Sequence, residues 1–473
     1  MRTMLCLLAA GVIAPGQQAP DRSQPPTVGP PSALHLPAIE KRTLSNGLQV
    51  WVMGVHKVPT VHVSLVVRTG AASDPQGRYG LASLTADMLD EGAGARSALE
   101  IADAVDFLGA ELSTDASIDS SYVGLHVPVA RLGNALPIMA DVVARPTFPA
   151  DELKRLREER LASLLEAQDD PEQLVQFAFP RVVFGAKHRY GSLAIGTAAS
   201  LNAITAADLK AFHAAQYRPS NARLIVAGDV TAASVVPMLE RAFRTWTGAS
   251  GAAGVRVPDA PQLTARQVDL IDKPGAAQSQ VRIGWIGVPR STPDYFALRV
   301  LNTVLGEAFT SRLNTNLREV HGYAYGAGSR FDMRRSGGVF YASAGVQTDK
   351  TVDALKEFFV ELAKIHERFT PEELEKAKSY LARQLPRNFE TERDAANALA
   401  QVYVYDLPPD YFETYAARVA AVTADEVKRA ADKYIQPDKF AVVIVGDRKA
   451  IEAGVRSLNL GPVTIIEPAE IFK

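Results

Sequence analysis

The chain has 473 residues, of which 47% are hydrophobic and 22% are charged, and its formal net charge is -2. This length exceeds what one ordinary hydrophobic core accommodates, so it predicts two or more domains. The near-neutral charge gives no electrostatic reason to expect nucleic acid as a partner. The single cysteine, Cys6, excludes disulfides and cysteine-based metal sites from the folded body.

The chain begins with a short apolar run that follows a basic residue. Residues 1–14 have the pattern of a secretory signal, and they are too short for a typical transmembrane helix, so no stable membrane insertion is expected. Residues 15–36 are rich in Pro, Gln and Ser and predict a disordered leader. We therefore expect a signal segment and leader over 1–36 and a periplasmic or secreted protein, with the cytoplasm as the alternative.

The next stretch, residues 37–246, mixes strand and helix signals. Asn46-Gly47 predicts a hairpin turn, and Ser97 with Glu100 predicts a capping box at the start of a helix. Strands are expected at 42–44, 48–53, 61–68, 111–118 and 121–128. Helices are expected at 79–90, 97–108, 131–144 and 151–167, and from there to about 184. The pattern predicts an α+β domain in which helices pack against a mostly antiparallel sheet.

A second stretch, residues 265–473, repeats this organisation. Residues 247–264 carry Gly, Ala, Ser and Pro and predict the linker that separates the two domains. Strands are then expected at 280–286 and 338–345, and helices at 295–305, 351–368 and 371–384.

The two halves also share sequence anchors. In each half a Thr caps a helix with an acid three residues later, Thr205 with Asp208 and Thr423 with Glu426, and an apolar strand ending in Gly-Asp follows. These strands end at 229 and 447, a shift of 218 residues, and the motif F-P-A-D-E-L at 148 matches F-T-P-E-E-L at 369, a shift of 221. Nearly equal shifts predict an internal duplication.

One stretch of the second half, residues 311–326, holds the candidate functional pair. Leu313, Leu317 and Val320 predict one apolar helix face, Gly322 predicts the helix end, and a strand is expected to follow. Arg318 in the last turn and Tyr325 on the outgoing strand are seven residues apart and are then expected to converge, an arrangement suited to donating hydrogen bonds to a carbonyl oxygen that gains negative charge. An Arg at a helix C-terminus and a Tyr in a strand are also ordinary structural choices, so both interpretations remain open.

Three features together resemble the pitrilysin or insulinase-like zinc peptidase family, and within it the group of processing peptidases. These are the duplicated α+β unit, the motif R-x-G-A-A-S-D-P-x-G-x-x-G-L-A from Arg68, and L-R-E-x-x-G-Y-A-Y from Leu317. The resemblance spans about residues 40–470. It implies two homologous domains and a peptidase function.

The family's zinc motif is missing. Active members carry H-x-x-E-H after G-L-A and a third ligand, a Glu, about 76 residues further on. Here Ser83 and Asp87 stand at the histidine positions, Ala86 at the glutamate and Ser163 at the third ligand. No histidines elsewhere form a pair at helical spacing, so we expect this chain to bind no metal. A hard cation at Asp87, Asp90 and Glu91 is the alternative.

The resemblance implies a role for the pair that remains. In catalytic assemblies of the family, an Arg and a Tyr seven residues later bind the substrate carbonyl and the oxyanion, which assigns that role to Arg318 and Tyr325, with Tyr323 as the rival. The chain would be the non-zinc subunit of a heterodimeric metalloendopeptidase, inactive alone. A homologous partner would carry the zinc, and unfolded peptides would be the substrates.

Two other functions stay open at this point. Some zinc-less relatives are scaffolds, like the core proteins of a respiratory complex, so the chain is alternatively a non-catalytic or peptide-binding subunit. An independent enzyme with unrelated chemistry has no support, because the sequence holds no G-x-S-x-G, P-loop or dinucleotide-binding motif.

Overall fold

The structure is a computed structural model that describes residues 29, 34–248 and 257–473. The predicted signal segment and leader therefore lie outside the described residues, except for 29 and 34–36. Residues 249–256 of the predicted linker lie outside them as well. Residues 34–473 form one compact unit.

The first half contains eight strands and eight α-helices among its described residues. The strands are β1 (Ile39–Thr43), β2 (Gln49–Gly54), β3 (Thr60–Val67), β4 (Gly92–Ala93), β5 (Arg96–Ser97), β6 (Glu111–Ala116), β7 (Ser121–Pro128) and β8 (Ala222–Gly228). The helices are α1 (Leu81–Asp87), α2 (Ala98–Phe107), α3 (Leu132–Ala144), α4 (Ala150–Asp169), α5 (Pro171–Phe184), α6 (Ala198–Ala203), α7 (Ala206–Gln216) and α8 (Ala232–Phe243).

The second half repeats the mixture and adds two π-helices. Its strands are β9 (Gln267–Asp272), β10 (Gln278–Ile286), β11 (Ala324–Asp332), β12 (Val339–Gln347), β13 (Ala441–Gly446) and β14 (Val463–Ile466). Its helices are α9 (Tyr295–Asn302), the π-helix η4 (Thr303–Glu307), α10 (Arg312–Asn314), the π-helix η5 (Thr315–Val320), α11 (Thr351–Lys364), α12 (Pro371–Gln384), α13 (Glu392–Val404), α14 (Tyr411–Ala421), α15 (Ala424–Tyr434), α16 (Arg448–Ser457) and α17 (Pro468–Ile471).

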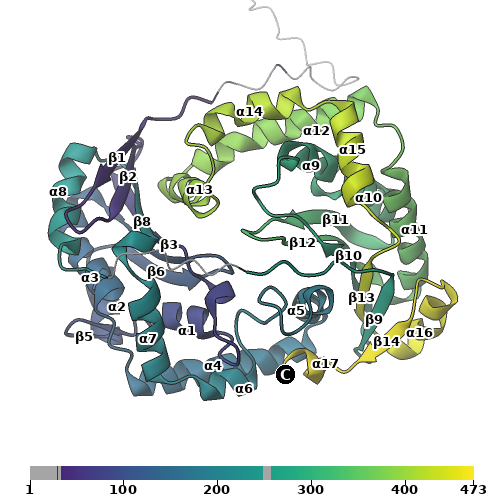
Figure 1. Cartoon of the computed structure of the whole chain (residues 1–473), viewed down its shortest axis with the longest axis horizontal. Coiled ribbons are helices and arrows are strands. Elements are labelled where there is room, and N and C mark those ends of the chain that lie inside the picture. Colours follow the sequence, from purple (N-terminus) through teal and green to yellow (C-terminus); the bar gives the residue numbers. More distant parts are fainter. Residues whose placement is uncertain (1–28, 30–33, 249–256) are drawn as a thin grey trace, which may run out of the picture. The chain divides into compact units, whose positions relative to one another are not determined.

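Each half is built on one six-stranded sheet (Figure 1), and the two sheets correspond in five strands, since β1 is antiparallel to β2 whereas β14 is parallel to β9. The first sheet has the order β1-β2-β8-β3-β7-β6, and the second, read from its other edge, has the order β14-β9-β13-β10-β12-β11. Most neighbouring strands are antiparallel, with parallel pairs at β2–β8, β9–β13 and β9–β14. The predicted α+β fold with two duplicated halves is confirmed. Strands β6 and β11 occupy equivalent sheet edges.

The local sequence signals have formed the predicted local structures. Strands β1 and β2 pair in an antiparallel hairpin, and Gly47 in the turn has φ +84°, which a glycine adopts without steric cost. The capping boxes at Ser97, Thr205 and Thr423 are all present. Helix α1 is shorter than predicted, since it spans seven residues.

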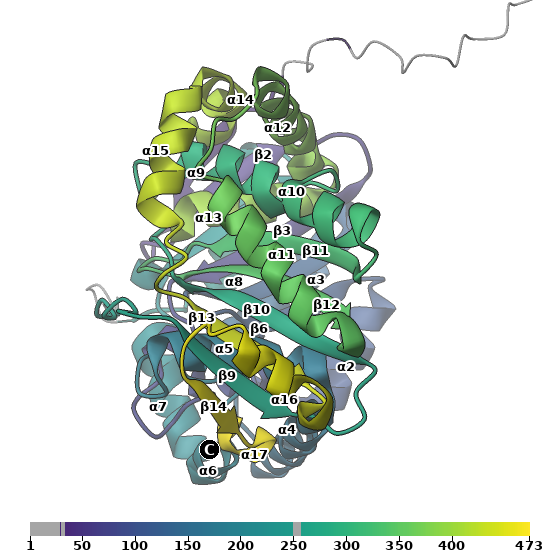
Figure 2. The ribbon, with the colours of Figure 1, turned by 90° about the vertical axis from the view of Figure 1, so that its right-hand side faces the viewer.

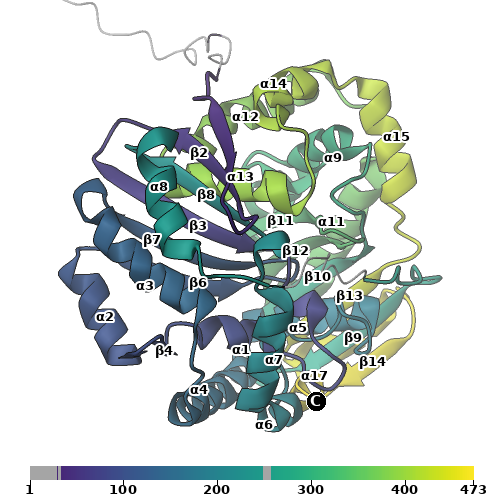
Figure 3. The same cartoon turned by 60° about the vertical axis from the view of Figure 1, so that its left-hand side comes forward.

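The halves exchange one helix each. Helix α5 of the first half packs against β10 and β13 of the second sheet, and α13 of the second half packs against β3 and β8 of the first sheet (Figure 3). The two helices begin at 171 and 392, a shift of 221 residues, so the exchange is reciprocal within the duplication. Figure 2 shows α11 and α16 on the other face of the second sheet. Each sheet is therefore buried partly by the opposite half.

Among the described residues, none of the helices combines the length and the apolar character needed to cross a membrane.

Candidate functional site

The side chains of Arg318 and Tyr325 lie against each other. The guanidinium carbon of Arg318 is 4.9 Å from the centroid of the Tyr325 ring. Helix η5 ends at Val320, the chain turns at Gly322, whose φ is +64°, and the N–H of Tyr323 donates to the carbonyl of Leu317 at 2.8 Å. This left-handed turn reverses the chain into β11 and brings the two residues together. The predicted proximity is present in the structure.

The predicted apolar face of this helix is wrong at one position. Leu313 and Leu317 are fully buried, whereas Val320 is 69% exposed. The prediction assumed an α-helix, but residues 315–320 form a π-helix. A π-helix has more residues in each turn, so Val320 rotates away from the face that Leu313 and Leu317 share.

A third residue, Phe309, completes the group around the guanidinium. Its ring centroid is 4.7 Å from the guanidinium carbon of Arg318, whose Nε also pairs with Glu319 at 3.1 Å. Asn314 fixes this arrangement, because its Nδ2 donates to the carbonyl of Phe309 at 2.6 Å and its Oδ1 accepts from the N–H of Ala327 at 3.1 Å. The buried amide thus connects the Phe309 loop to β11.

The geometry favours Tyr325 over its rival. Tyr323 lies just before β11, and its ring stacks on His321 with centroids 4.9 Å apart. Tyr325 lies where the pairing of β11 with β12 shifts register, and it is 85% exposed. A cavity of about 620 Å³ is lined by Tyr325, Arg318 and Phe309 among others. A ligand in this cavity would meet the phenol of Tyr325.

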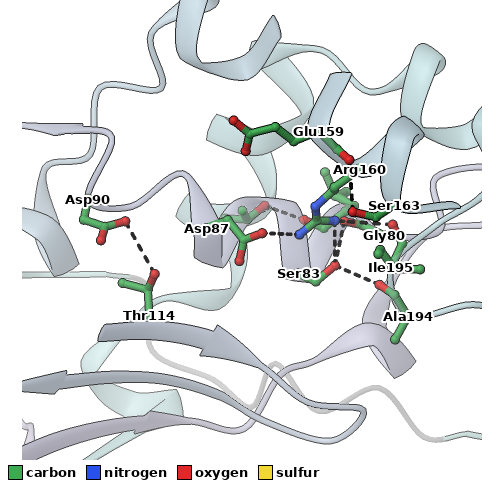
Figure 4. Close-up of polar contacts among 12 residues, drawn as sticks. Gly80, Ser83, Asp87, Asp90, Thr114, Glu159, Arg160, Ser163, Ala194 and Ile195 are labelled. Atoms are coloured by element: carbon green, nitrogen blue, oxygen red, sulfur yellow. Dashed lines mark hydrogen bonds and ion pairs between the residues drawn. The ribbon is translucent and has the colours of Figure 1, made fainter. Parts of the chain in front are cut away.

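The positions of the missing zinc motif are occupied by an arginine from another helix (Figure 4). Ser83 and Asp87 lie one turn apart on α1, and Arg160 of α4 reaches between them. Its Nη1 donates to Ser83 Oγ at 2.9 Å, and its Nη2 pairs with Asp87 Oδ2 at 2.5 Å. Ala86 is fully buried, and the Ser163 hydroxyl donates to the carbonyl of Glu159 in its own helix at 3.1 Å.

The three acids considered as a hard-cation site do not converge. Asp87 pairs with Arg160, Glu91 pairs with Arg155 at 2.5 Å, and Asp90 accepts from the Thr114 hydroxyl at 3.5 Å. Burial raises the pKa of Asp90 to about 6. In the part of the chain that the structure describes, no group of three or more His, Cys, Asp or Glu side chains is placed to hold a metal ion.

Helix α1 is held by a buried acid that the sequence reasoning did not single out. The carboxylate of Asp74 accepts from the N–H groups of Gly80 and Ala82, both at 2.7 Å, and so caps the start of α1. Burial raises the pKa of Asp74 to about 7, although these two hydrogen bonds act in the opposite direction. Asp74 belongs to the motif that begins at Arg68, so that motif was the sequence signal that could have identified Asp74.

Comparison with known proteins covers most of the chain. Residues 52–194 match the family model described as insulinase (peptidase family M16), and residues 203–381 match that of the peptidase M16 inactive domain. An uncharacterized zinc protease of Mycobacterium leprae is 28% identical over 331 residues, which are 69% of this chain and 73% of that protein. The crystal structure of a peptidase M16 inactive domain from Pseudomonas fluorescens aligns with a TM-score of 0.80 and 27% identity over 86% of this chain and 98% of that chain. A chain of complex III2 from Candida albicans has the same fold, with a TM-score of 0.74 and 14% identity over 90% of this chain and 100% of that chain.

The chain belongs to the insulinase family of peptidases. The family's zinc does not fit the residues present at its expected position. Zinc sites in proteins use imidazole, thiolate and carboxylate ligands, whereas these positions offer two hydroxyls and one carboxylate. That carboxylate, Asp87, already pairs with a guanidinium, and a second cation at the same place would be repelled by it. That this insulinase-family chain binds no cofactor remains a prediction.

Sequence reasoning on this insulinase-family chain located Arg318 and Tyr325 but missed two side chains that contact the candidate sites. Arg160 lies three residues before Ser163 on the same helix, yet nothing in the local pattern shows that it faces α1. Phe309 is in the loop before α10, where no periodicity applies. Both side chains are placed by packing between segments distant in the sequence.

Proposed function

We propose that this chain is the non-zinc subunit of a heterodimeric metalloendopeptidase. A homologous partner that carries the zinc motif would supply the hydrolytic centre. This chain would supply Arg318 and Tyr325, which bind the carbonyl of the peptide bond under attack. The observation that supports the proposal most directly is the exposed contact between the Arg318 guanidinium and the Tyr325 ring, in a chain whose own zinc positions are taken by Arg160.

The chemistry of the pair suits a developing oxyanion. The guanidinium donates in-plane N–H groups and carries a permanent charge, and the phenol donates one O–H. Donors that are held in place before the reaction stabilise the transition state without reorganisation, and each contributes on the order of a hundred- to thousandfold in rate. The contact with Phe309 and the Asn314 hydrogen bonds support such preorganisation.

Unfolded peptides are the expected substrates. Strands β6 and β11 lie at sheet edges, so each presents one row of backbone groups that its own sheet does not use. An extended peptide added to such an edge is bound by main-chain hydrogen bonds, which do not depend on its sequence. Tyr325 lies on β11, as does Arg330, and Tyr325 contacts Arg318. A peptide at this edge would therefore pass the candidate pair of Arg318 and Tyr325.

The scaffold function is the second candidate, and the fold shared with a complex III2 chain is what favours it. A scaffold would need neither the exposure of Tyr325 nor the donors of Arg318. The two proposals therefore differ in what a conservative change at these residues does to activity and to assembly.

The decisive experiment combines the purified chain with a homologue that carries H-x-x-E-H. We expect peptide hydrolysis to require both chains and to stop when a chelator removes the metal. Arg318→Ala and Tyr325→Phe should each lower kcat on the order of a hundredfold while the two chains still co-elute. Tyr323→Phe is the matched control and should have little effect. Wild-type rates in both Arg318→Ala and Tyr325→Phe would favour the scaffold instead.

A further inference from the structure

Two neighbouring cavities adjoin each other, and residues of both halves line them. The cavity beside Arg318 has a volume of about 620 Å³, and the next has about 730 Å³. They share the lining residues Gly306, Glu307, Gly328 and Ser343, so they adjoin, and we call the two together the arginine cavity. At Gly306 a Cβ atom would lie 2.1 Å from the N–H nitrogen of Ser329, so only glycine allows this close approach of η4 to β11.

Five arginines line the arginine cavity, and two of them, Arg299 and Arg318, pair with Glu307 and Glu319. Of the other three, Arg282, Arg290 and Arg330, the first two lie over aromatic rings. The guanidinium carbon of Arg282 is 4.5 Å from the ring centroid of Tyr341, and that of Arg290 is 3.6 Å from the ring centroid of Tyr295. Arg330, on β11, is exposed at the cavity wall. Across residues 34–248 and 257–473, none of these three guanidinium groups forms an ion pair or a hydrogen bond.

Arg290 is the most enclosed of these three arginines, because the residue is only 8% exposed. An aromatic ring attracts the charge of a guanidinium but does not accept its five N–H donors in the ring plane. No guanidinium nitrogen of Arg290 is both buried and without a partner, so its donors still reach the open space of the cavity. Arg290 therefore presents a cation whose donors an anion in the cavity can use.

The carboxylates in the cavity wall offset these charges only in part. Glu307 pairs with Arg299 at 2.6 Å, and Asp332 pairs with Arg334 at 2.8 Å. Glu172 is the remaining carboxylate of the wall, and its charge raises the pKa of Arg282 while burial, the larger effect, lowers that pKa. The cavity is thus locally positive in a chain whose net charge is -2.

We propose that the arginine cavity binds the acidic side chains of the peptide substrate, so that the substrates of this subunit are peptides rich in Asp and Glu. The inference rests on the proposed function. A carboxylate accepts two parallel hydrogen bonds from one guanidinium, and the rings beside Arg282 and Arg290 accept none of their in-plane N–H groups. Arg282 lies in the cavity that contains Arg318, and Arg330 lies five residues beyond Tyr325 on β11. At roughly 3.3 Å per residue, acidic residues close to the cleaved bond and about five positions away would reach these arginines.

Binding of labelled peptides to the full-length chain tests the proposal without the partner. The probes are three unstructured peptides of about twelve residues, long enough to span the cavity at roughly 3.3 Å per residue. They differ only in having Glu, Gln or Lys at the same positions, and their affinities are measured by fluorescence anisotropy. We expect the Glu peptide to bind about tenfold or more tightly than the Gln peptide, and this advantage to shrink at high salt.

Substitutions then locate the site. Arg282→Gln, Arg290→Gln and Arg330→Gln should each weaken the Glu peptide about three- to tenfold and leave the Gln peptide nearly unchanged. Arg448→Gln, an arginine of α16 that pairs with Glu452, is the matched control. If the buried Arg290 variant fails to fold, as circular dichroism would show, the exposed Arg330 variant still decides the result.

Equal affinity for the Glu and Gln peptides, or preference for the Lys peptide, would overturn the proposal. So would a Glu preference that survives in both Arg282→Gln and Arg330→Gln. The outcome is separable from the proposed function. Tight binding of the Glu peptide without hydrolysis in the presence of the zinc-bearing partner would refute only the peptidase proposal. Hydrolysis of the Glu and Gln peptides with equal kcat/KM would refute only this inference.

Discussion

The guanidinium of Arg160 is a cation of the chain itself, and it occupies the space between Ser83 and Asp87. It also lies 3.3 Å from the carbonyl of Ile195, while Ser83 donates to the carbonyl of Ala194 at 2.8 Å. One side chain thus joins α1, α4 and the loop before α6.

The purified chain should accordingly contain no stoichiometric zinc by metal analysis, and one zinc per chain would contradict this account.

The pairing of Arg160 with Asp87 also predicts a stability effect. Arg160→Met should lower the free energy of unfolding by about 1 to 3 kcal/mol, because it leaves a part-buried carboxylate and hydroxyl without their donor. Asp87→Asn in the same chain should recover part of the loss, since no uncompensated charge then remains. Urea unfolding of both single variants and the double variant measures the coupling. Strictly additive losses would show that the two residues do not interact.

The raised pKa of Asp74 predicts a pH dependence. The carboxyl has a pKa of about 7 in the folded chain and about 4 when unfolded, so the folded state binds the proton more tightly. The resulting stabilisation is complete below about pH 4 and is lost as the pH rises to about 7, by an amount on the order of a few kcal/mol. Asp74→Asn removes this contribution.

The measurement must compare variants at each pH. Burial lowers the pKa of His62 to about 4, which gives the opposite slope over much of the same range. The unfolding free energy of wild type minus that of Asp74→Asn should therefore fall from pH 4 to pH 7. A difference that stays constant or rises would mean that the N–H groups of Gly80 and Ala82 keep Asp74 ionised.

At the scale of elements, two π-helices border the candidate pair. Helix η4 forms part of the cavity wall, and η5 carries Arg318 at its end. A π-helix is rare and is less stable than an α-helix, so it is retained where the wider turn places a side chain that function needs. The buried amide of Asn314, between these segments, fixes both the Phe309 loop and the irregular start of β11.

Asn314 is therefore the sharpest test of this arrangement. Asn314→Ala should lower the free energy of unfolding by about 1 to 3 kcal/mol, because it leaves a carbonyl and an N–H without partners. Asn314→Asp keeps the acceptor for Ala327 but puts a buried carboxylate oxygen beside the carbonyl of Phe309 in place of the donor, so its loss should be larger. Urea unfolding measures both, and hydrolysis in the two-chain assay should decrease in the same order. Equal stability of all three proteins would show that Asn314 does not hold the loop.

At the scale of the whole molecule, the exchange of α5 and α13 makes the two halves depend on each other. Leu174, Val175 and Ala178 of α5 are buried in the cluster that includes Val443 and Val445 of β13. A half without its counterpart would expose both a helix face and a sheet face to water. Each buried large aliphatic side chain contributes about 1.5 to 3 kcal/mol, so the loss exceeds the stability of an ordinary domain.

Separate expression of residues 34–246 and 257–473 tests this dependence. We expect each half alone to aggregate or to unfold without cooperativity, and the two halves to form a soluble complex when expressed together. Size-exclusion chromatography and thermal circular dichroism give the result. Cooperative unfolding of either half alone at the melting temperature of the intact chain would contradict it.

The sequence alone determined the features that depend on neighbouring residues. A few neighbouring residues suffice to recognise the capping boxes, the Asn46-Gly47 turn and the loss of the zinc motif. The duplication was recognised from such local motifs occurring twice, at shifts of 218 and 221 residues. A local pattern constrains the backbone wherever it lies in the fold. It also placed Arg318 near Tyr325, because one glycine turn joins their two elements. The prediction of a buried side chain failed at Val320, because it assumed an α-helix where the chain forms a π-helix.

Only the tertiary structure decided which distant side chains meet. Arg160 reaches Asp87 across 73 residues of sequence, Phe309 joins Arg318 through a loop, and the arginines of the cavity come from separate strands and loops. An apolar helix face specifies that it is buried but not which sheet covers it, so the exchange of α5 and α13 was invisible as well. These contacts depend on how whole elements pack, and many sequences satisfy the same local pattern while packing differently.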